Sequence, residues 1–265
     1  MQGIADYRFI RPLGDGGHGT FYLAVPPARL GITAEHVAVK VLRGATDEET
    51  VRRTSRELRA FASAKSPYLV TLYDAGQQGD SLFYSMEFFA LGSLAAPAHG
   101  LTRSSVLTAM SQVARAAHAL HEAGVVHHSI KPENVMLHSS GARLSDLGLV
   151  QSLAPGQTVT GLGPIGAVEY VEPSIILGEK GSRASDIWAL AMTLHRALTG
   201  TGAYGDLPPH DALFAVRKVL STRPQLSPIL QPADADLIGR CLETNPAQRP
   251  RDALTLAEEL EVLAG

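Results

Sequence analysis

The 265-residue sequence contains one cysteine, Cys241, and few aromatic side chains, which make up 6% of the chain. A single cysteine excludes a disulfide within the chain and is typical of proteins from reducing compartments. The ten histidines show no paired Cys/His spacing of the kind that binds zinc. We therefore expect neither a disulfide framework nor a zinc site.

Long apolar runs and a strong net charge are also missing. No stretch approaches the roughly 18 apolar residues of a membrane-spanning helix, and no basic segment followed by an apolar stretch opens the chain. The net charge of −3 gives no electrostatic attraction to nucleic acid or to an anionic membrane. We expect a cytoplasmic protein without nucleic-acid partners or membrane insertion, although a domain excised from a larger membrane protein would have the same composition.

What is present indicates a folded α+β chain in two parts, with 45% hydrophobic and 18% charged residues. In the first part, short apolar runs between turn residues predict strands over 8–14, 19–25, 36–42, 68–76 and 81–89. Val51, Leu58 and Phe61 suit one face of a helix over 46–65. Glycine, proline and alanine then gather over 91–100, which indicates a boundary near residue 90.

The second part is predicted to be mostly helical. Apolar residues recur at helical spacing from Val106 to Leu120 and from Ile187 to Leu194, and a glycine follows each run, at positions 124 and 200. Glycines and prolines between residues 154 and 173 predict a long loop.

The stretch LGDGGHG places Gly14, Gly16 and Gly19 at the spacing G-x-G-x-x-G between two predicted strands. Alone, this spacing is as consistent with a plain tight turn as with a phosphate-binding loop. Lys40 ends the apolar run HVAVK, and a lysine at a strand end is ordinarily solvated. The meaning of both features therefore depends on the motifs that follow them.

Those motifs are a helix that carries Glu57, then KPEN with Asn134, then SDLG with Asp146. In this order, the features resemble a protein kinase domain of the bacterial, eukaryotic-like Ser/Thr kinase type, from about residue 6 to the end of the chain. The resemblance implies the two-lobed protein kinase fold, with an N-terminal lobe over 1–89 and a C-terminal lobe over 90–265.

The resemblance also implies a site for ATP and magnesium. The glycine loop would cover the phosphates, Lys40 would contact the α- and β-phosphates, and Glu57 would hold Lys40 in place. Asn134 and Asp146 correspond to the two magnesium-binding positions, with the hard oxygen ligands that this ion requires.

The adenine of ATP would lie between Ala38 and Met136 and pair with the backbone of the hinge, formed by Met86, Glu87 and Phe88. Phe21 replaces the valine that packs on adenine in this family, and its bulk would either crowd the pocket or stack there.

The stretch VVHHSIKPENVML departs from the family at its chemical centre, because Ser129 stands where kinases have the catalytic aspartate. A serine hydroxyl cannot act as that carboxylate does, although Lys131 is retained. His128 replaces an arginine. Its imidazole titrates in the range of a general base, but adjacent loop residues point in different directions, so we favour a packed or exposed histidine.

Further departures lie in the segment IGAVEYVEPS. Ala167 replaces a threonine that contacts the catalytic aspartate and lysine in kinases. Ser174 replaces a glutamate that pairs with an arginine matching Arg249. We expect Glu172, two residues earlier, as the substitute partner of Arg249.

Apart from Phe21, which lies on the nucleotide side, these departures belong to the acceptor side, whereas Lys40, Glu57, Asn134 and Asp146 of the nucleotide side are retained. We therefore predict a pseudokinase that binds ATP and magnesium and acts as a scaffold or allosteric partner of another signalling protein or kinase. A weak phosphotransferase stays open as an alternative, because phosphoryl transfer depends mainly on positioning and charge stabilisation. An interaction module without nucleotide is the third reading, and it follows if Phe21 fills the adenine pocket.

Overall fold

The computed structural model describes residues 2–16, 19–42, 48–146, 165–208 and 211–265, without the side chains at 48–50, 53, 57, 165 and 166. The chain divides into two compact units. Unit 1 comprises residues 1–63 and 70–89, and unit 2 comprises residues 64–69 and 90–265. The short segment 64–69 therefore belongs to the second unit, although it lies within the first part of the sequence.

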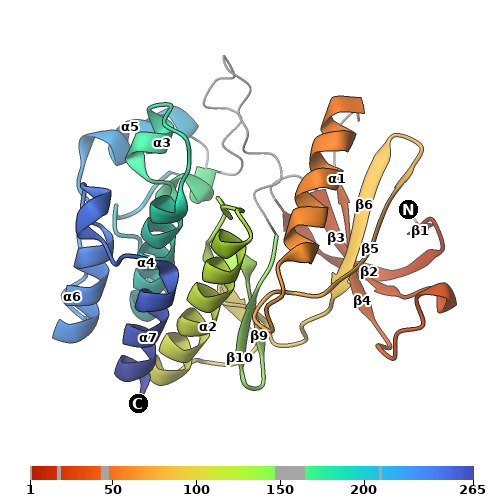
Figure 1. The fold of residues 1–265 in the computed structure, drawn as a ribbon, viewed down its shortest axis with the longest axis horizontal. Helices are drawn as coiled ribbons and strands as arrows, with labels where there is room; N and C mark the ends of the chain where they lie inside the picture. Colours follow the sequence, from red (N-terminus) through yellow and green to blue (C-terminus); the bar gives the residue numbers. More distant parts are fainter. Residues whose placement is uncertain (1, 17–18, 43–47, 147–164, 209–210) are drawn as a thin grey trace. The chain divides into compact units, whose positions relative to one another are not determined.

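Unit 1 is an antiparallel sheet with one helix beside it (Figure 1). The strand order is β1-β2-β3-β4-β6-β5. The elements are β1 Gly3–Ile4, β2 Tyr7–Gly16, β3 Gly19–Val25, the short 3-10 helix η1 Ala28–Leu30, β4 Val37–Leu42, α1 Glu48–Ser63, β5 Leu72–Gln78 and β6 Ser81–Glu87. The five predicted strands and the predicted helix are present.

The strand boundaries differ from the prediction most clearly at β5. The strand expected over 68–76 runs from Leu72 to Gln78, and its end lies later because Gly79 adopts a φ of 56° and forms the turn to β6 together with Asp80. The two glutamines that follow residue 76 therefore pair with β6.

Alternation along β4 separates the core of unit 1 from its functional face. Val37, Val39 and Val41 lie in a buried cluster with Tyr7 and Phe83. Because successive side chains of a strand point to opposite faces, Ala38 and Lys40 lie on the other face of the sheet. The valines of HVAVKVL thus build the core of unit 1, while Lys40 of the same strand lies on the opposite face.

Unit 2 combines helices with a small sheet of strand order β10-β9-β7-β8 (Figure 1). Its helices are α2 Arg103–Glu122, α3 Pro173–Ile176, α4 Arg183–Thr199, α5 Ala212–Ser221, α6 Pro232–Cys241 and α7 Ala253–Ala264, with 3-10 turns η2 Pro132–Asn134, η4 Ile165–Tyr170 and η5 Pro246–Gln248. Its strands are β7 Gly92–Ser93, β8 Ala96–Pro97, β9 Val135–His138 and β10 Gly141–Leu144. The small sheet was not predicted, because strands of two to four residues are too short to show a period.

The two predicted long helices correspond to α2 and α4. Thr102 and Ser182 cap their N-termini through side-chain hydrogen bonds, and Gly200 ends α4 in the left-handed conformation with a φ of 71°. Both helices pack against α7, and their contact faces are buried. In the part of the chain that the structure describes, no helix has both the length and the apolar character that crossing a bilayer requires.

The long loop predicted over 154–173 is wrong for its last residues, where η4 and the start of α3 lie. Residues 154–164 of that prediction lie outside the described residues.

Candidate active site

In unit 1, Lys40 lies between two aromatic residues on the neighbouring strands. The register pairs Lys40 with Phe21 of β3 on one side and with Tyr84 of β6 on the other. Its ammonium nitrogen lies 4.8 Å from the ring centroid of Phe21 and 5.9 Å from that of Tyr84. Lys40 is only 2% exposed. Its charged ammonium is therefore buried against the sheet and its aromatic neighbours.

The glycines of the loop between β2 and β3 have requirements of their own. A Cβ at Gly19 would lie 2.3 Å from the backbone oxygen of Val41, so only glycine allows β3 to approach β4 there. Gly14 has a φ of 143°, a conformation that side chains rarely adopt, and Gly16 pairs with Gly19 across the hairpin. Strand geometry thus explains two of the three glycines, and the case for phosphate binding depends on Lys40.

The predicted adenine contacts of unit 1 lie along two paired strands. Ala38 on β4 and Met86 on β6 are cross-strand partners, and both are buried. The backbone N–H of Glu87 donates to the oxygen of Thr71 at 3.0 Å, which fixes the end of β6 where the predicted hinge begins. Phe88 follows directly and is half-buried.

The side chain of Glu57 lies outside the described residues, so its pairing with Lys40 stays a prediction. Met136, predicted to contact adenine, belongs to unit 2, where it is half-buried on β9 and pairs with Arg143 and Ser93.

In unit 2, a buried aspartate fixes the backbone of the loop that contains Ser129. Asp186 of α4 accepts hydrogen bonds from the backbone N–H groups of His127, at 2.8 Å, and His128, at 3.0 Å. His121 Nε2 donates to the same carboxylate at 2.8 Å. Burial alone would raise the pKa of Asp186, but these hydrogen bonds and the nearby imidazoles lower it below its usual range. The loop is therefore anchored to a carboxylate that stays ionised.

Sequence reasoning missed Asp186. It lies in the first turn of α4, where an acidic residue ordinarily complements the helix dipole and suggests no further role. Its sequence context could have indicated that the carboxylate is buried, because Asp186 stands beside a long apolar run and is followed by Ile187 and Trp188.

His127 joins this loop to the strand end before Asp146. Its Nδ1 accepts from the backbone N–H of Ser129 at 3.2 Å, and its Nε2 faces the carbonyl of Ser145 at 3.1 Å. This pattern requires the proton on Nε2. Burial lowers the pKa of His127 to about 4, so the ring is neutral near pH 7.

The neutral histidines predict a loss of stability in mild acid. Between the folded pKa of about 4 and the unfolded value of 6.5, the unfolded chain binds a proton at His127 that the folded chain does not. Stability should therefore fall as pH is lowered through this window, by about 3 kcal/mol for His127 alone. His128 and His195, whose pKa values burial also lowers, add to it in the same direction.

Urea unfolding at several pH values between 7 and 4.5 measures this dependence. The variant His127→Gln should be less stable at pH 7 but lose less stability on acidification. An equal pH slope in parent and variant would contradict the assignment.

His128 points toward the turn before α4. A Cβ at Gly181 would lie 2.3 Å from its Nδ1, so the ring packs directly on that glycine. His128 adopts a φ of 63°, a left-handed backbone conformation. Its side chain therefore projects in a different direction from that of a residue in a regular strand. The ring thus contacts Gly181 on one side, while the residue as a whole is exposed.

The three predicted residues Ser129, Asn134 and Asp146 are brought together by one amide group. Asn134 Nδ2 donates to the backbone oxygen of Ser129 at 2.7 Å, to its Oγ at 3.1 Å and to the backbone oxygen of Asp146 at 3.3 Å. Ser145 fixes the arrangement through its N–H and hydroxyl, which both donate to the backbone oxygen of Asn134. Lys131 precedes the η2 turn that positions Asn134 and is half-buried.

This arrangement fits a hard cation. Because the nitrogen of the Asn134 amide is used within the loop, its Oδ1 and the carboxylate of Asp146 would be the atoms that hold a metal, and both are oxygen donors of the type that magnesium prefers. Asp146 adopts a φ of 55°, a strained conformation for a residue other than glycine and one typical of functional positions. Within the described residues, no group of three or more His, Cys, Asp or Glu side chains forms a further metal cluster.

On the acceptor side, Glu172 pairs with Arg249, as predicted. The carboxylate accepts from Arg249 Nη2 at 2.5 Å. Arg249 also donates to the backbone oxygens of Glu243 and Ala184 and lies 5.3 Å from the Trp188 ring centroid. The acidic residue of this ion pair thus stands two residues before Ser174, the position that it has in the family, and the pair is kept.

The other two substituted positions of the acceptor side lie close by in the sequence. Ala167, where kinases have threonine, is buried in η4. Ser174, where they have glutamate, is half-buried in α3. Neither side chain supplies the group that the family has at its position.

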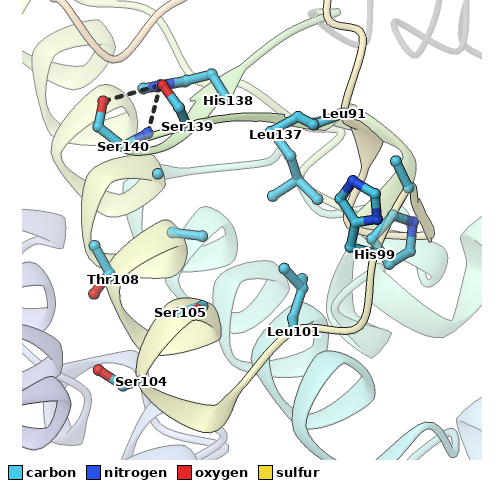
Figure 2. Close-up of a pocket in the computed structure, with 14 residues that line it drawn as sticks. Leu91, His99, Leu101, Ser104, Ser105, Thr108, Leu137, His138, Ser139 and Ser140 are labelled. Atoms are coloured by element: carbon cyan, nitrogen blue, oxygen red, sulfur yellow. Dashed lines mark hydrogen bonds between the residues drawn. The ribbon is translucent and has the colours of Figure 1, made fainter.

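A cavity of about 440 Å³ lies elsewhere in unit 2, between the start of α2 and the β9–β10 turn (Figure 2). The imidazoles of His99 and His138 and the side chains of Leu101 and Leu137 contribute to its lining. None of the described residues that line it is a lysine, an arginine or an acid, and none is a predicted site residue. The cavity is therefore separate from the candidate active site.

Comparisons with known proteins bear on the family and the fold. The family model for the protein kinase domain matches residues 7–260. Serine/threonine-protein kinase Pkn2 of Myxococcus xanthus is 30% identical over 96% of this chain and 32% of its own length. Serine/threonine-protein kinase PknA of Mycobacterium tuberculosis is 31% identical over 95% of this chain and 60% of its own length. The crystal structure of a mutant of the Mycobacterium tuberculosis PknI kinase domain matches with a TM-score of 0.70 and 25% identity over 100% of this chain and 99% of that chain.

The chain belongs to the protein kinase family and has the two-lobed protein kinase fold, which confirms the predicted fold class. It spans about a third of the length of curated relatives such as Pkn2. The likeness to those Ser/Thr kinases therefore concerns their kinase domain.

Proposed function

We propose that the chain is a pseudokinase, which binds ATP with magnesium but transfers phosphate poorly or not at all. The observation that carries this proposal is Ser129, a hydroxyl in place of a catalytic carboxylate within a loop that is otherwise fully anchored. His127, Asp186 and Asn134 hold its backbone by hydrogen bonds of 2.7 to 3.2 Å. The backbone of the loop is therefore held in position, but the loop lacks the carboxylate that would accept a proton from the acceptor hydroxyl.

The nucleotide side supports ATP binding. Lys40 presents a buried ammonium, and Ala38 and Met86 present small and flexible apolar surface on neighbouring strands. Asn134 and Asp146 would hold magnesium, which neutralises charge on the phosphates when it is bound. A buried lysine is costly unless it is paired or used, and an aspartate in a strained conformation is typical of functional positions.

Such a domain would act by binding a partner protein and not by catalysis. Nucleotide can favour one conformation of a protein over another only through a difference in affinity, and the residues described above supply contacts for phosphate and metal. We propose that the partner is another signalling protein or kinase, for which the chain serves as a scaffold or allosteric regulator.

A second candidate function is a weak phosphotransferase. Lys131 is retained, and the relatives named above carry the names of Ser/Thr kinases. Because phosphoryl transfer depends largely on positioning, the anchored loop favours residual activity even without the carboxylate. The third reading, an interaction module without nucleotide, is less favoured, because the ring of Phe21 lies against the Lys40 ammonium.

Calorimetric titration with ATP, with and without magnesium, tests the proposal. The parent should bind ATP in a magnesium-dependent way, and Lys40→Ala should weaken binding about 10- to 100-fold, because a charge-assisted contact to phosphate is lost. Lys180→Ala, at an exposed lysine, is the matched control and should bind as the parent does.

The same proteins distinguish the two candidate functions in a phosphotransfer assay with generic protein acceptors. Absence of turnover in a parent that binds ATP supports the pseudokinase. Robust turnover in the parent that Lys40→Ala abolishes would refute it in favour of the enzyme, and absence of ATP binding would refute both.

A further inference from the structure

Two aromatic side chains flank Lys40, and contact of its ammonium with phosphates does not by itself require them. Phe21, Lys40 and Tyr84 occupy directly opposed positions on β3, β4 and β6, so their side chains project from the same face of the sheet. The lysine therefore has an aromatic side chain on each side along the hydrogen-bonding direction. Lys40 and Tyr84 are each 2% exposed, and Phe21 is half-buried.

The geometry matches two cation–π contacts to one ammonium. Both ring centroids lie within 6 Å of Lys40 Nζ, at 4.8 Å for Phe21 and 5.9 Å for Tyr84. The face of an aromatic ring carries partial negative charge, and its attraction for an ammonium strengthens when water is excluded. An aliphatic residue at position 21 would fill similar space but offer no such face.

We propose that Phe21 and Tyr84 form an aromatic clamp that holds the Lys40 ammonium where it meets the phosphates of a bound nucleotide. Phe21 is then a positioning residue that acts through Lys40, and its ring supports nucleotide binding instead of blocking it. This inference rests on the proposed binding of ATP for its functional consequence, while the clamp itself is a property of the free chain.

The clamp makes a prediction opposite to that of a filled adenine pocket. If Phe21 blocked adenine, Phe21→Leu would tighten the binding of both ATP and adenosine. If Phe21 positions Lys40, Phe21→Leu should weaken ATP about tenfold, because the phosphate contact is loosened, and leave adenosine unchanged. The ratio of the two affinities therefore separates positioning from simple filling of space.

Calorimetry with ATP and adenosine on the whole chain measures this ratio. The sharper series replaces Phe21 by phenylalanines that carry one, two and three ring fluorines, which keep the shape and progressively remove the negative face. ATP affinity should fall stepwise along this series. Phe9→Leu is the matched control, because Phe9 is half-buried in the same sheet but stacks on Tyr22. A flat response to fluorination, or tighter ATP binding in Phe21→Leu, would overturn the proposal.

An NMR measurement tests the clamp without nucleotide. The ring currents of Phe21 and Tyr84 should shift the ε-methylene protons of Lys40, and Phe21→Leu should remove most of the shift. A parent without the shift would refute the clamp. A parent that shows the shift but binds no ATP would support the clamp and refute its role in nucleotide binding together with the proposed function.

Discussion

Replacing Ser129 by aspartate is expected to raise phosphoryl transfer to a generic peptide acceptor by about 100-fold or more, because a positioned general base contributes about 100- to 10,000-fold. The loop needs no rearrangement for this gain. The backbone N–H of Ser129 donates to His127, its carbonyl accepts from Asn134, and the preceding residues are bound to Asp186. A carboxylate at position 129 would therefore inherit a fixed backbone.

The measurement is initial-rate transfer of labelled phosphate from ATP, at equal ATP occupancy for parent and variant. Ser129→Asn, which has the shape of aspartate without its charge and basicity, is the control and should show no gain. Adding Asp146→Asn to Ser129→Asp should remove the restored rate, because a proposed magnesium ligand is lost.

A Ser129→Asp variant that binds ATP as the parent does, yet gains no activity, would contradict this expectation. It would place the defect on the acceptor side, where Ala167 stands for threonine and is buried in η4. Ala167→Thr in the Ser129→Asp background would then be the variant to measure.

The site residues predicted from the sequence stand in short motifs of fixed local spacing. Lys40, Asn134 and Asp146 were predicted because the order of HVAVK, KPEN and SDLG along the chain resembles that of a protein kinase domain. Tyr84 could not be predicted in the same way, because its position opposite Lys40 depends on the register between β4 and β6, which are separated in the chain by α1 and β5.

The elements of the fold follow the same division. Strands β2 to β6 contain short apolar runs between turn residues, and helices α1, α2 and α4 contain apolar residues at helical spacing, so these elements could be predicted from the sequence. The small sheet of unit 2 is held by pairings such as Ser93 with Met136, which only tertiary structure creates. Similarly, the buried contacts of Asp186 with His121 and His127 join residues that lie 59 to 65 positions apart.

The ion pair of Arg249 shows how a departure from the family pattern can be structural compensation and not loss. In the family, the acidic partner stands where this chain has Ser174. Here Glu172, which directly precedes α3, reaches the guanidinium instead, and Arg249 keeps two further bonds to backbone oxygens. The segment around α3 is thus still anchored to the helical core, even though its sequence has lost the usual motif.

Neutralising this pair is expected to produce a large loss of stability. Glu172→Gln keeps the size of the side chain but leaves the guanidinium of Arg249, whose side chain is 0% exposed, without a counter-charge. Breaking a buried pair by removing one partner costs about 3–5 kcal/mol, because an uncompensated charge stays buried. Urea unfolding at pH 7 should show this loss, whereas Glu179→Gln, at an exposed position, should change stability by less than about 0.5 kcal/mol.

A double-mutant cycle distinguishes the pair from general damage at the site. Arg249→Leu alone should also destabilise the chain, since it leaves the backbone oxygens of Glu243 and Ala184 without their donor. The double variant Glu172→Gln with Arg249→Leu should lose clearly less than the two single losses added together, because the second change removes the unpaired charge that the first one creates. Additive losses would mean that Glu172 and Arg249 act independently, and the compensation inferred for Ser174 would then be wrong.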